Sequence, residues 1–396
     1  MEWSMVKQRL MGYAESFSEL SRAYYMAGAD GEYLRESTEE KCRNLSRQQL
    51  LEEQKLKESR IAVGETMGAL AGIMADIAEE MGTYYPVEEK KKRLIMQVLK
   101  GEGFYIDNLY YLPGDGEKTV IGMSLSTDKK GGKPAKAVAD ILSVIYKKQI
   151  RLCVSSQSRV EKEAQWFVFK EEATYMVLTG FAKATKEEES VSGDHYAIVE
   201  SEKGKLTLIL SDGTGSGERA GENSGRVLDL MEKFMETGYD AGGAIRIVNT
   251  AYYAMEEEGN HPTMDVCELD LYDGHCDICK VGGAATFIKH GEAVEQISES
   301  VLPLGILQSI DTKTVHRKLQ SGDYVIMMTD GVLDVLADYE EKQVLSMAEM
   351  ISSLSQINAE EMAQELLRQV LQLSGGRIKD DMTILVAGIW ENSIIS

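Results

Sequence analysis

Four aspartates in the second half of the chain stand where carboxylates can do metal chemistry. Asp194 and Asp380 each come just before a predicted strand, whereas Asp212 and Asp330 each follow an apolar one. The last two belong to Asp-Gly pairs, which are weak evidence alone because their usual role is a tight turn. Their position adds weight, since a carboxylate at the end of a buried strand is held rigidly and is still reached by solvent.

These four carboxylates have no obvious basic partner nearby in the sequence. They repel one another unless a cation lies between them. Mg²⁺ and Mn²⁺ take oxygen ligands and keep several waters, so a few carboxylates suffice to hold them. Two such ions can hold a bridging hydroxide for in-line attack on phosphorus. The pattern therefore predicts two divalent cations, Mn²⁺ or Mg²⁺, and hydrolysis of a phosphate ester.

The order of the motifs resembles that of the metal-dependent type 2C serine/threonine phosphatases. It most resembles the bacterial branch typified by stage II sporulation protein E. The motifs are Ser-Gly-Asp at 192–194, Asp-Gly-x-Gly-x-Gly at 212–217, Thr-Asp-Gly at 329–331 and Asp-Asp-Met-Thr at 380–383, joined by Val281–Ala284 and Leu302–Ile306. The resemblance covers nearly the whole chain and is strongest from Gly193 onward.

This resemblance implies a function and a role for each aspartate. Relatives of this branch remove phosphate from phosphoserine on an anti-anti-sigma factor and so release a sporulation sigma factor. By the same resemblance, Asp212 bridges both metals and the Gly213 carbonyl ligates one of them. Asp330 and Asp380 hold the other metal, and Asp194 is a further ligand. Catalysis is thereby assigned to Asp212, Asp330 and Asp380, the last preferred over its neighbour Asp381 by the Asp-x-Met-Thr pattern.

The chain also departs from the family pattern. The arginine that grips phosphate in eukaryotic relatives has no evident counterpart, and no histidine is clearly placed as a general acid. His195 follows Asp194, so strand alternation points it to the opposite face of the sheet.

Three other interpretations compete with the phosphatase. A dinucleotide fingerprint fits Gly215-x-Gly217-x-x-Ala220, but a Rossmann unit requires a strand after the next helix, and residues 240–258 indicate a second helix. Cys276 and Cys279 have a zinc-like spacing without a second ligand pair, which favours two cysteines of an ordinary strand. A catalytically silent signalling or binding module of the same fold is the main alternative.

Composition excludes several classes of partner and location. The chain has 396 residues, a net charge of −22 and five cysteines. Such negative charge argues against binding nucleic acid, and the sparse, odd cysteine count argues against a disulfide framework. No apolar run is long enough to span a membrane, and no export signal is apparent. We expect a cytoplasmic protein, or one associated with the membrane if this chain is part of a longer one with an anchor.

The N-terminal 83 residues are predicted to form long helices. Apolar residues recur every 3.5 residues from Val6 to Tyr24 and again from Val63 to Met81. A break is expected at Gly28–Gly31, followed by a capping box at Ser37-x-x-Glu40. This segment is either a hairpin packed on the rest of the chain or a coiled-coil-like linker that forms a homodimer.

The remaining chain is predicted to form two α+β domains. Residues 84–189 indicate a small regulatory domain whose last strand covers 173–182, and residues 190–396 the phosphatase domain. The resemblance implies that the latter is a four-layer α-β-β-α sandwich. Helices at 217–237 and 240–258 start directly after the predicted metal loop, so we hypothesise that they, or the N-terminal helices, carry regulation and dimer contacts.

Overall fold

The computed structural model describes residues 2–33, 47–80, 83–112, 118–187, 189, 191–201, 204–213, 218–255, 261–298, 301–307, 310–337, 346–354 and 358–392. Contacts within the chain define two compact units. The smaller comprises Met1–Met11, Ala75–Thr174 and Asn392–Ser396, and the larger comprises Gly12–Met74 and Tyr175–Glu391.

Two long helices, α1 (Glu2–Tyr33) and α2 (Arg47–Glu80), precede the domains, as predicted. Their buried positions are small residues spaced by seven: Ala14 and Ser21 on α1, and Gly64, Ala71 and Ala78 on α2. The Ser21 hydroxyl donates to the Gly64 carbonyl at 2.7 Å. The predicted apolar seam is not the buried face of α1, because Val6, Tyr13 and Leu20 are exposed and small residues occupy the buried positions.

One expected feature of α1 is wrong. The helix does not end at Gly28–Gly31 but continues to Tyr33. Each glycine costs a helix only about 1 kcal/mol, which the preceding turns of an uninterrupted helix can absorb. The capping box predicted at residues 37–40 lies outside the described residues.

The smaller unit contains a five-stranded sheet with the order β1-β2-β3-β7-β5. Its elements are β1 (Tyr85–Pro86), α3 (Glu89–Gly101), β2 (Tyr105–Tyr111), β3 (Val120–Ser126), β4 (Lys133–Pro134), α4 (Lys136–Tyr146), β5 (Ile150–Leu152), β6 (Arg159–Val160) and β7 (Gln165–Glu171). Helices α3 and α4 bury Leu99 and Leu142 against Ile121 and Phe167 of the sheet. This is the predicted α+β module.

The strand expected to complete that module belongs elsewhere. Strand β8 (Tyr175–Ala184) pairs over its whole length with β17 (Met382–Glu391) of the larger unit. The sequence at 173–182 correctly indicated a strand. Its partner could not be read from it, because β17 is two hundred residues away in the chain.

The larger unit contains two five-stranded antiparallel sheets. Sheet one has the order β15-β12-β11-β10-β9, with β9 (Asp194–Glu200), β10 (Lys205–Asp212), β11 (Met264–Asp270), β12 (His275–Val281) and β15 (Thr314–Lys318). Sheet two has the order β14-β13-β16-β17-β8, with β13 (Thr286–His290), β14 (Ala293–Ile297) and β16 (Tyr324–Met328).

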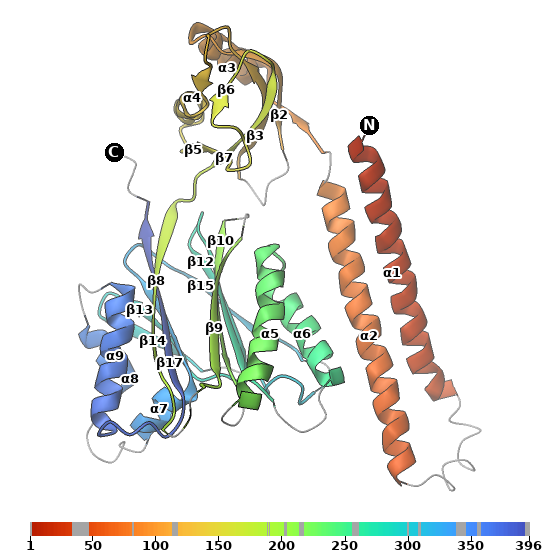
Figure 1. Cartoon of the computed structure of the whole chain (residues 1–396), viewed down its shortest axis with the longest axis vertical. Helices are drawn as coiled ribbons and strands as arrows, with labels where there is room; N and C mark the ends of the chain where they lie inside the picture. The colour runs from red at the N-terminus through yellow and green to blue at the C-terminus, as the bar shows by residue number, and fades with distance from the viewer. Residues whose placement is uncertain are drawn as a thin grey trace. The chain divides into compact units, whose positions relative to one another are not determined.

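Helices cover the outer face of each sheet, giving the expected α-β-β-α layers (Figure 1). Helices α5 (Glu218–Glu236) and α6 (Ala241–Met255) bury Met231 and Ile245 against Ile209 and Val266 of sheet one. Helices α7 (Asp330–Ala337), α8 (Met347–Ser353) and α9 (Ala359–Leu373) cover sheet two. Their Asn358 and Ser346 N-caps form capping boxes with Glu361 and Glu349, which fix where α9 and α8 begin.

This topology argues against both the dinucleotide-binding unit and the zinc site. Helix α5 is followed directly by helix α6, so the strand that a dinucleotide unit requires does not occur there. Cys276 and Cys279 lie on β12, where Cys276 contacts Cys267 and Cys279 contacts Thr314. They are ordinary residues of a buried strand, as predicted. None of the described helices combines the length and apolar character needed to cross a membrane.

Candidate metal centre

Asp194 and Asp212 are directly opposite each other on neighbouring antiparallel strands. The register of β9 and β10 pairs Asp212 with Asp194 at the end of both strands. The Asp212 backbone is fixed from its other side, where its N–H donates to Thr263 Oγ1 at 3.2 Å and its carbonyl accepts from Thr263 N at 2.8 Å. Two carboxylates that the sequence places 18 residues apart are thus held as a pair.

Asp194 is completely buried and joins the two sheets. Its Oδ2 accepts hydrogen bonds from Thr329 Oγ1 at 2.9 Å and from Thr383 Oγ1 at 2.7 Å; Thr329 directly follows β16 and Thr383 lies on β17, both strands of sheet two. Its Oδ1 is buried without a hydrogen-bond partner among the described residues. Burial raises the pKa of Asp194 to about 6, although the two threonines lower it.

The pKa of Asp212 is shifted further than that of Asp194. Burial raises its pKa to about 9, and the carboxylates of Asp194, Asp330 and Asp380 add to the shift. Asp330 is also within hydrogen-bonding reach of Asp212. The other three predicted metal aspartates are therefore close enough to Asp212 to repel it, and this repulsion opposes ionisation of Asp212 in the metal-free protein.

The structure separates the roles of the adjacent Asp380 and Asp381. Asp380 is half exposed and takes part in the cluster around Asp212, with Lys186 Nζ at 3.9 Å from its Oδ1. Asp381 is buried and accepts from the backbone N–H groups of Lys186 (2.9 Å) and Gly193 (2.6 Å). Asp381 thus joins the start of β17 to the start of β9.

Close packing requires a glycine beside Asp330, and a backbone hydrogen bond fixes the glycine beside Asp212. A Cβ at Gly331 would lie 2.2 Å from the Asp381 carbonyl oxygen, so no larger residue fits after Asp330. The Gly213 N–H donates to the Gly193 carbonyl at 3.3 Å, which places the Gly213 backbone beside Asp194.

The residues present fit divalent cations. The candidate ligands are all hard oxygen donors, one of them carries an orphaned buried oxygen, and their mutual repulsion is relieved by positive charge. Among the described residues, no three acidic, histidine or cysteine side chains are grouped so that they could hold a metal ion by themselves. Mg²⁺ and Mn²⁺ need few protein ligands, because they complete their coordination with water.

Several residues of the site escaped the sequence prediction. Thr263, Thr329 and Thr383 contact the aspartates directly, and the Lys183 Nζ donates to the Asp194 carbonyl at 2.6 Å. Thr329 and Thr383 belong to two of the motifs already described. The sequence did not show that these two threonines contact Asp194, because Asp194 is distant from both in the chain. His195 behaves as expected, since its Nδ1 lies 2.9 Å from Ser224 on α5, on the helix-covered face.

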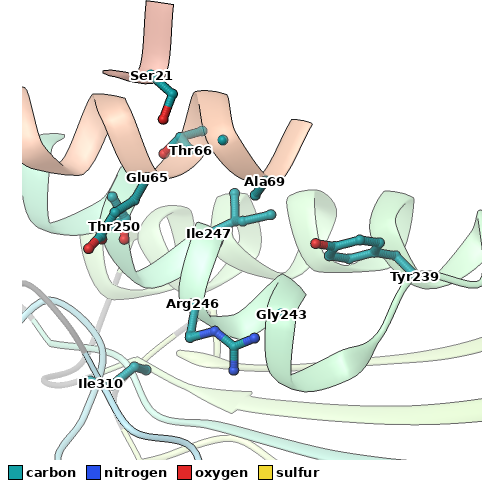
Figure 2. A pocket seen from close by; sticks show the side chains of 11 residues that line it. Ser21, Glu65, Thr66, Ala69, Tyr239, Gly243, Arg246, Ile247, Thr250 and Ile310 are labelled. Carbon is teal, nitrogen blue, oxygen red and sulfur yellow. The ribbon is translucent and has the colours of Figure 1, made fainter. Parts of the chain in front are cut away.

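Among the described residues of the larger unit, two cavities bear on the site or on the elements near it. A small one of about 10 Å³ is lined by Asp212, Asp330 and Asp265, together with Thr263 and Thr329. A larger one of about 400 Å³ lies between α2 and α6, with Glu65 and Ala69 on one side and Arg246 and Thr250 on the other (Figure 2). Only the small cavity is at the aspartate cluster.

Comparison with known proteins gives the same family for both parts of the chain. Residues 202–390 match the model of "Stage II sporulation protein E (SpoIIE)", and residues 4–171 match "SpoIIE, regulatory domain". Stage II sporulation protein E of Bacillus subtilis is 31% identical over 342 residues, covering 86% of this chain and 41% of the relative. The Priestia megaterium protein of the same name is 29% identical, with 85% and 58% coverage.

More distant and structural relatives agree. The phosphoserine phosphatase RsbU of B. subtilis is 21% identical over 198 residues, covering 50% of this chain and 59% of the relative. The structure of the PP2C phosphatase domain and part of the regulatory domain of B. subtilis SpoIIE has a TM-score of 0.59 and 29% identity, covering 86% of this chain and 98% of that one. This chain spans about half the length of the SpoIIE relatives. With matched domains in order and the aspartate cluster in place, the chain belongs to the stage II sporulation protein E family of type 2C phosphatases.

Proposed function

We propose that this chain is a protein phosphatase that hydrolyses phosphoserine on an anti-anti-sigma factor, using two divalent cations, in the control of a sporulation sigma factor. The observation that carries the proposal is the convergence of Asp194, Asp212, Asp330 and Asp380 from both sheets on one site. The names of two relatives, stage II sporulation protein E and phosphoserine phosphatase RsbU, support sporulation and phosphoserine, and the anti-anti-sigma factor is what the family resemblance implies.

Each residue of the cluster has a proposed role. Asp212 and the Gly213 carbonyl would hold the cations together with Asp330 and Asp380, and Asp194 would be a further ligand. When bound, Mn²⁺ or Mg²⁺ supplies Lewis-acid activation of water and neutralises charge on the phosphoryl group. Thr329 and Thr383 fix the orientation of Asp194, and Thr263 fixes the backbone of Asp212. No described histidine faces the cluster from β9, since His195 contacts α5.

The catalytically silent binding module remains the second candidate. A binding module requires only the fold. The raised pKa of Asp212 shows that the carboxylates of the cluster repel one another, and this repulsion opposes folding in the absence of cations. A protein without metal chemistry gains nothing from retaining that repulsion.

The test is Mn²⁺-dependent release of phosphate from a phosphoserine anti-anti-sigma protein. Asp212→Asn is expected to lower turnover by at least a thousandfold while the protein stays folded. Asp273→Asn is a matched control, because Asp273 also stands in an Asp-Gly turn but lies at the β11–β12 hairpin. Absence of both turnover and millimolar Mn²⁺ binding in the wild type would leave the binding module as the function.

Regulation through helices is part of the proposal. Helix α6 follows α5, which begins just after the predicted metal loop, and α6 shares the larger cavity with α2 (Figure 2). A shift of α6 relative to α2 would be transmitted along α5 toward Asp212 and Gly213. We therefore assign α5 and α6 as a lever that acts on the site. The position of α2 relative to α6 then favours one of the two states of the site.

A further inference from the structure

A buried ion pair lies beside the aspartate cluster, outside the four predicted ligands. Lys280 Nζ on β12 contacts Asp265 Oδ2 on β11 and also donates to Thr286 Oγ1 at 3.0 Å. The side chains are only 1% and 3% exposed. Burying two charges costs several kcal/mol of desolvation, so well-packed apolar residues would often serve stability equally well. The pair therefore calls for an explanation other than stability.

The environment of the second carboxylate oxygen of Asp265, Oδ1, suggests a role for the ion pair in the site. The Val281 backbone N–H lies beside the Asp265 carboxylate, but Oδ1 is fully buried and has no partner with hydrogen-bond geometry among the described residues. Asp265 lines the 10 Å³ cavity together with Asp212 and Asp330. A cavity of about this volume holds a single water molecule when it offers polar partners.

The absence of a side chain at Gly283 leaves space for the Asp265 carboxylate. An ideal Cβ at Gly283 would lie 2.2 Å from Asp265 Oδ1, so the Asp265 carboxylate occupies the space that a side chain on residue 283 would take. Lys280 balances the charge of Asp265, so the pair adds a hydrogen-bond acceptor to the site without adding a fifth net negative charge.

We propose that Asp265, held by Lys280, is a positioning residue of the metal centre: its Oδ1 accepts a hydrogen bond from a water that fills the small cavity and contacts Asp212 and Asp330. This inference rests on the proposed function, because the water matters only if cations bind at those aspartates. Removing a partner that orients metal ligands typically weakens metal affinity 10- to 100-fold.

The experiment compares two double variants in which the ion pair is replaced without leaving a lone buried charge. Asp265→Leu with Lys280→Met removes the acceptor, whereas Asp265→Asn with Lys280→Met keeps an amide oxygen at the same place. The Mn²⁺ dissociation constant is measured by electron paramagnetic resonance of free Mn²⁺, and near-ultraviolet circular dichroism monitors folding. We expect the Leu/Met variant to bind Mn²⁺ 10- to 100-fold more weakly and the Asn/Met variant to recover most of the loss.

A matched control comes from the neighbouring strand pair of the same sheet, β10 and β11. Glu268 on β11 accepts from Lys205 on β10 at 2.6 Å, away from the small cavity. Glu268→Gln with Lys205→Met is expected to leave Mn²⁺ affinity unchanged. Equal Mn²⁺ affinity in the wild type and both Asp265 variants would overturn the inference, as would equal losses in the two variants, which indicate a purely structural role.

A second measurement needs no variant. In a crystal of the wild-type protein grown with Mn²⁺, we expect an ordered water within hydrogen-bond distance of Asp265 Oδ1. A dry cavity would refute the inference even if the variants failed to fold. Failure of the wild type to bind Mn²⁺ would instead refute the proposed function and the inference with it, so the two failures are distinguishable.

Discussion

The same residue type serves two opposite purposes within this site. Asp381 accepts two backbone hydrogen bonds and stabilises the meeting of β9 and β17. Asp212 is crowded by three other carboxylates, and its environment opposes ionisation. A carboxylate kept under such repulsion destabilises the metal-free fold, which is the usual relation between a functional site and stability.

This contrast predicts opposite effects of two Asp→Asn substitutions on the metal-free protein. Asp212→Asn is expected to raise the unfolding temperature in EDTA, by about 2–4 °C for each kcal/mol of repulsion relieved. Asp381→Asn weakens two charge-assisted hydrogen bonds and is expected to lower it. Differential scanning calorimetry with EDTA checks both. A lower unfolding temperature for Asp212→Asn would mean that Asp212 is structural.

The raised pKa values also predict how stability and metal binding depend on pH. Asp194 and Asp212 have pKa values of about 6 and 9 in the folded chain, above about 3.9 for an unfolded aspartate. Between pH 4 and 9 these two aspartates therefore bind more protons in the folded metal-free protein than in the unfolded chain. Their contribution to the unfolding free energy falls as pH rises through this window.

Cations must displace those protons, so Mn²⁺ affinity is expected to rise with pH, by up to about tenfold per unit for each proton displaced. Urea unfolding in EDTA and Mn²⁺ titration, both at pH 5, 6, 7 and 8, measure the two trends. In Asp212→Asn the stability trend should flatten above pH 7. A pH-independent Mn²⁺ affinity would contradict the proposed ligand role of Asp212.

At the scale of elements, close packing of α9 on β8 depends on a glycine. A Cβ at Gly180 would lie 2.2 Å from the Glu360 backbone, so the first turn of α9 rests directly on the strand. Glu360 Oε2 also accepts from the Phe181 N–H at 3.1 Å. The local sequence does not predict this contact, because β8 and α9 are far apart in the chain.

Gly180→Ala is therefore expected to destabilise the protein by about 1–3 kcal/mol, the usual cost of overpacking. Gly72→Ala is the matched control, because no atom lies within 4 Å of a Cβ there and alanine favours the helix α2 by about 1 kcal/mol. Urea unfolding of the two variants should give shifts of opposite sign. A neutral Gly180→Ala would show that α9 can move away from β8 at little cost.

The elements that the sequence predicted well are those with a local signal. The period-two strand β3, the apolar strand β16 and helix α5 match the expected ranges within about one residue, and α6 begins within one residue of its expected start. The aspartate cluster was predicted because all four residues stand at strand ends and match family motifs. The partners of β8, the threonines around Asp194 and the pairing of Lys280 with Asp265 were not, since each depends on contacts between distant segments.

At the scale of the whole molecule, α1 presents an apolar stripe to solvent. Val6, Tyr13 and Leu20 recur every seven residues and are 44%, 57% and 45% exposed. The face of α1 that meets α2 uses Ala14 and Ser21 instead. A heptad stripe of this kind is the pattern by which helices associate between chains, and we propose it as the surface of a homodimer.

Tyr13→Glu with Leu20→Glu is expected to shift the protein toward monomer by at least tenfold in dissociation constant. Gln8→Glu with Ala23→Glu adds the same charge at exposed positions of α1 outside the stripe. Sedimentation equilibrium over a range of concentrations distinguishes them. Identical behaviour of the two variants would exclude this stripe as the dimer surface.

The lever proposed for α2 and α6 makes the last prediction. The cavity that α2 and α6 share means that this face of α6 is not fully packed, so its position is sensitive to what α2 presents. Deletion of residues 1–83, or Ala69→Trp on the cavity wall, is expected to change Mn²⁺ affinity or turnover by about 5- to 150-fold, the usual range of coupling between sites. Ile77→Trp is the control, because Ile77 is an exposed position of the same helix. Unchanged Mn²⁺ affinity and turnover in both the deletion and Ala69→Trp would place regulation elsewhere. A lever that reaches Asp212 through α5 must respond when the helix that lines the shared cavity is removed.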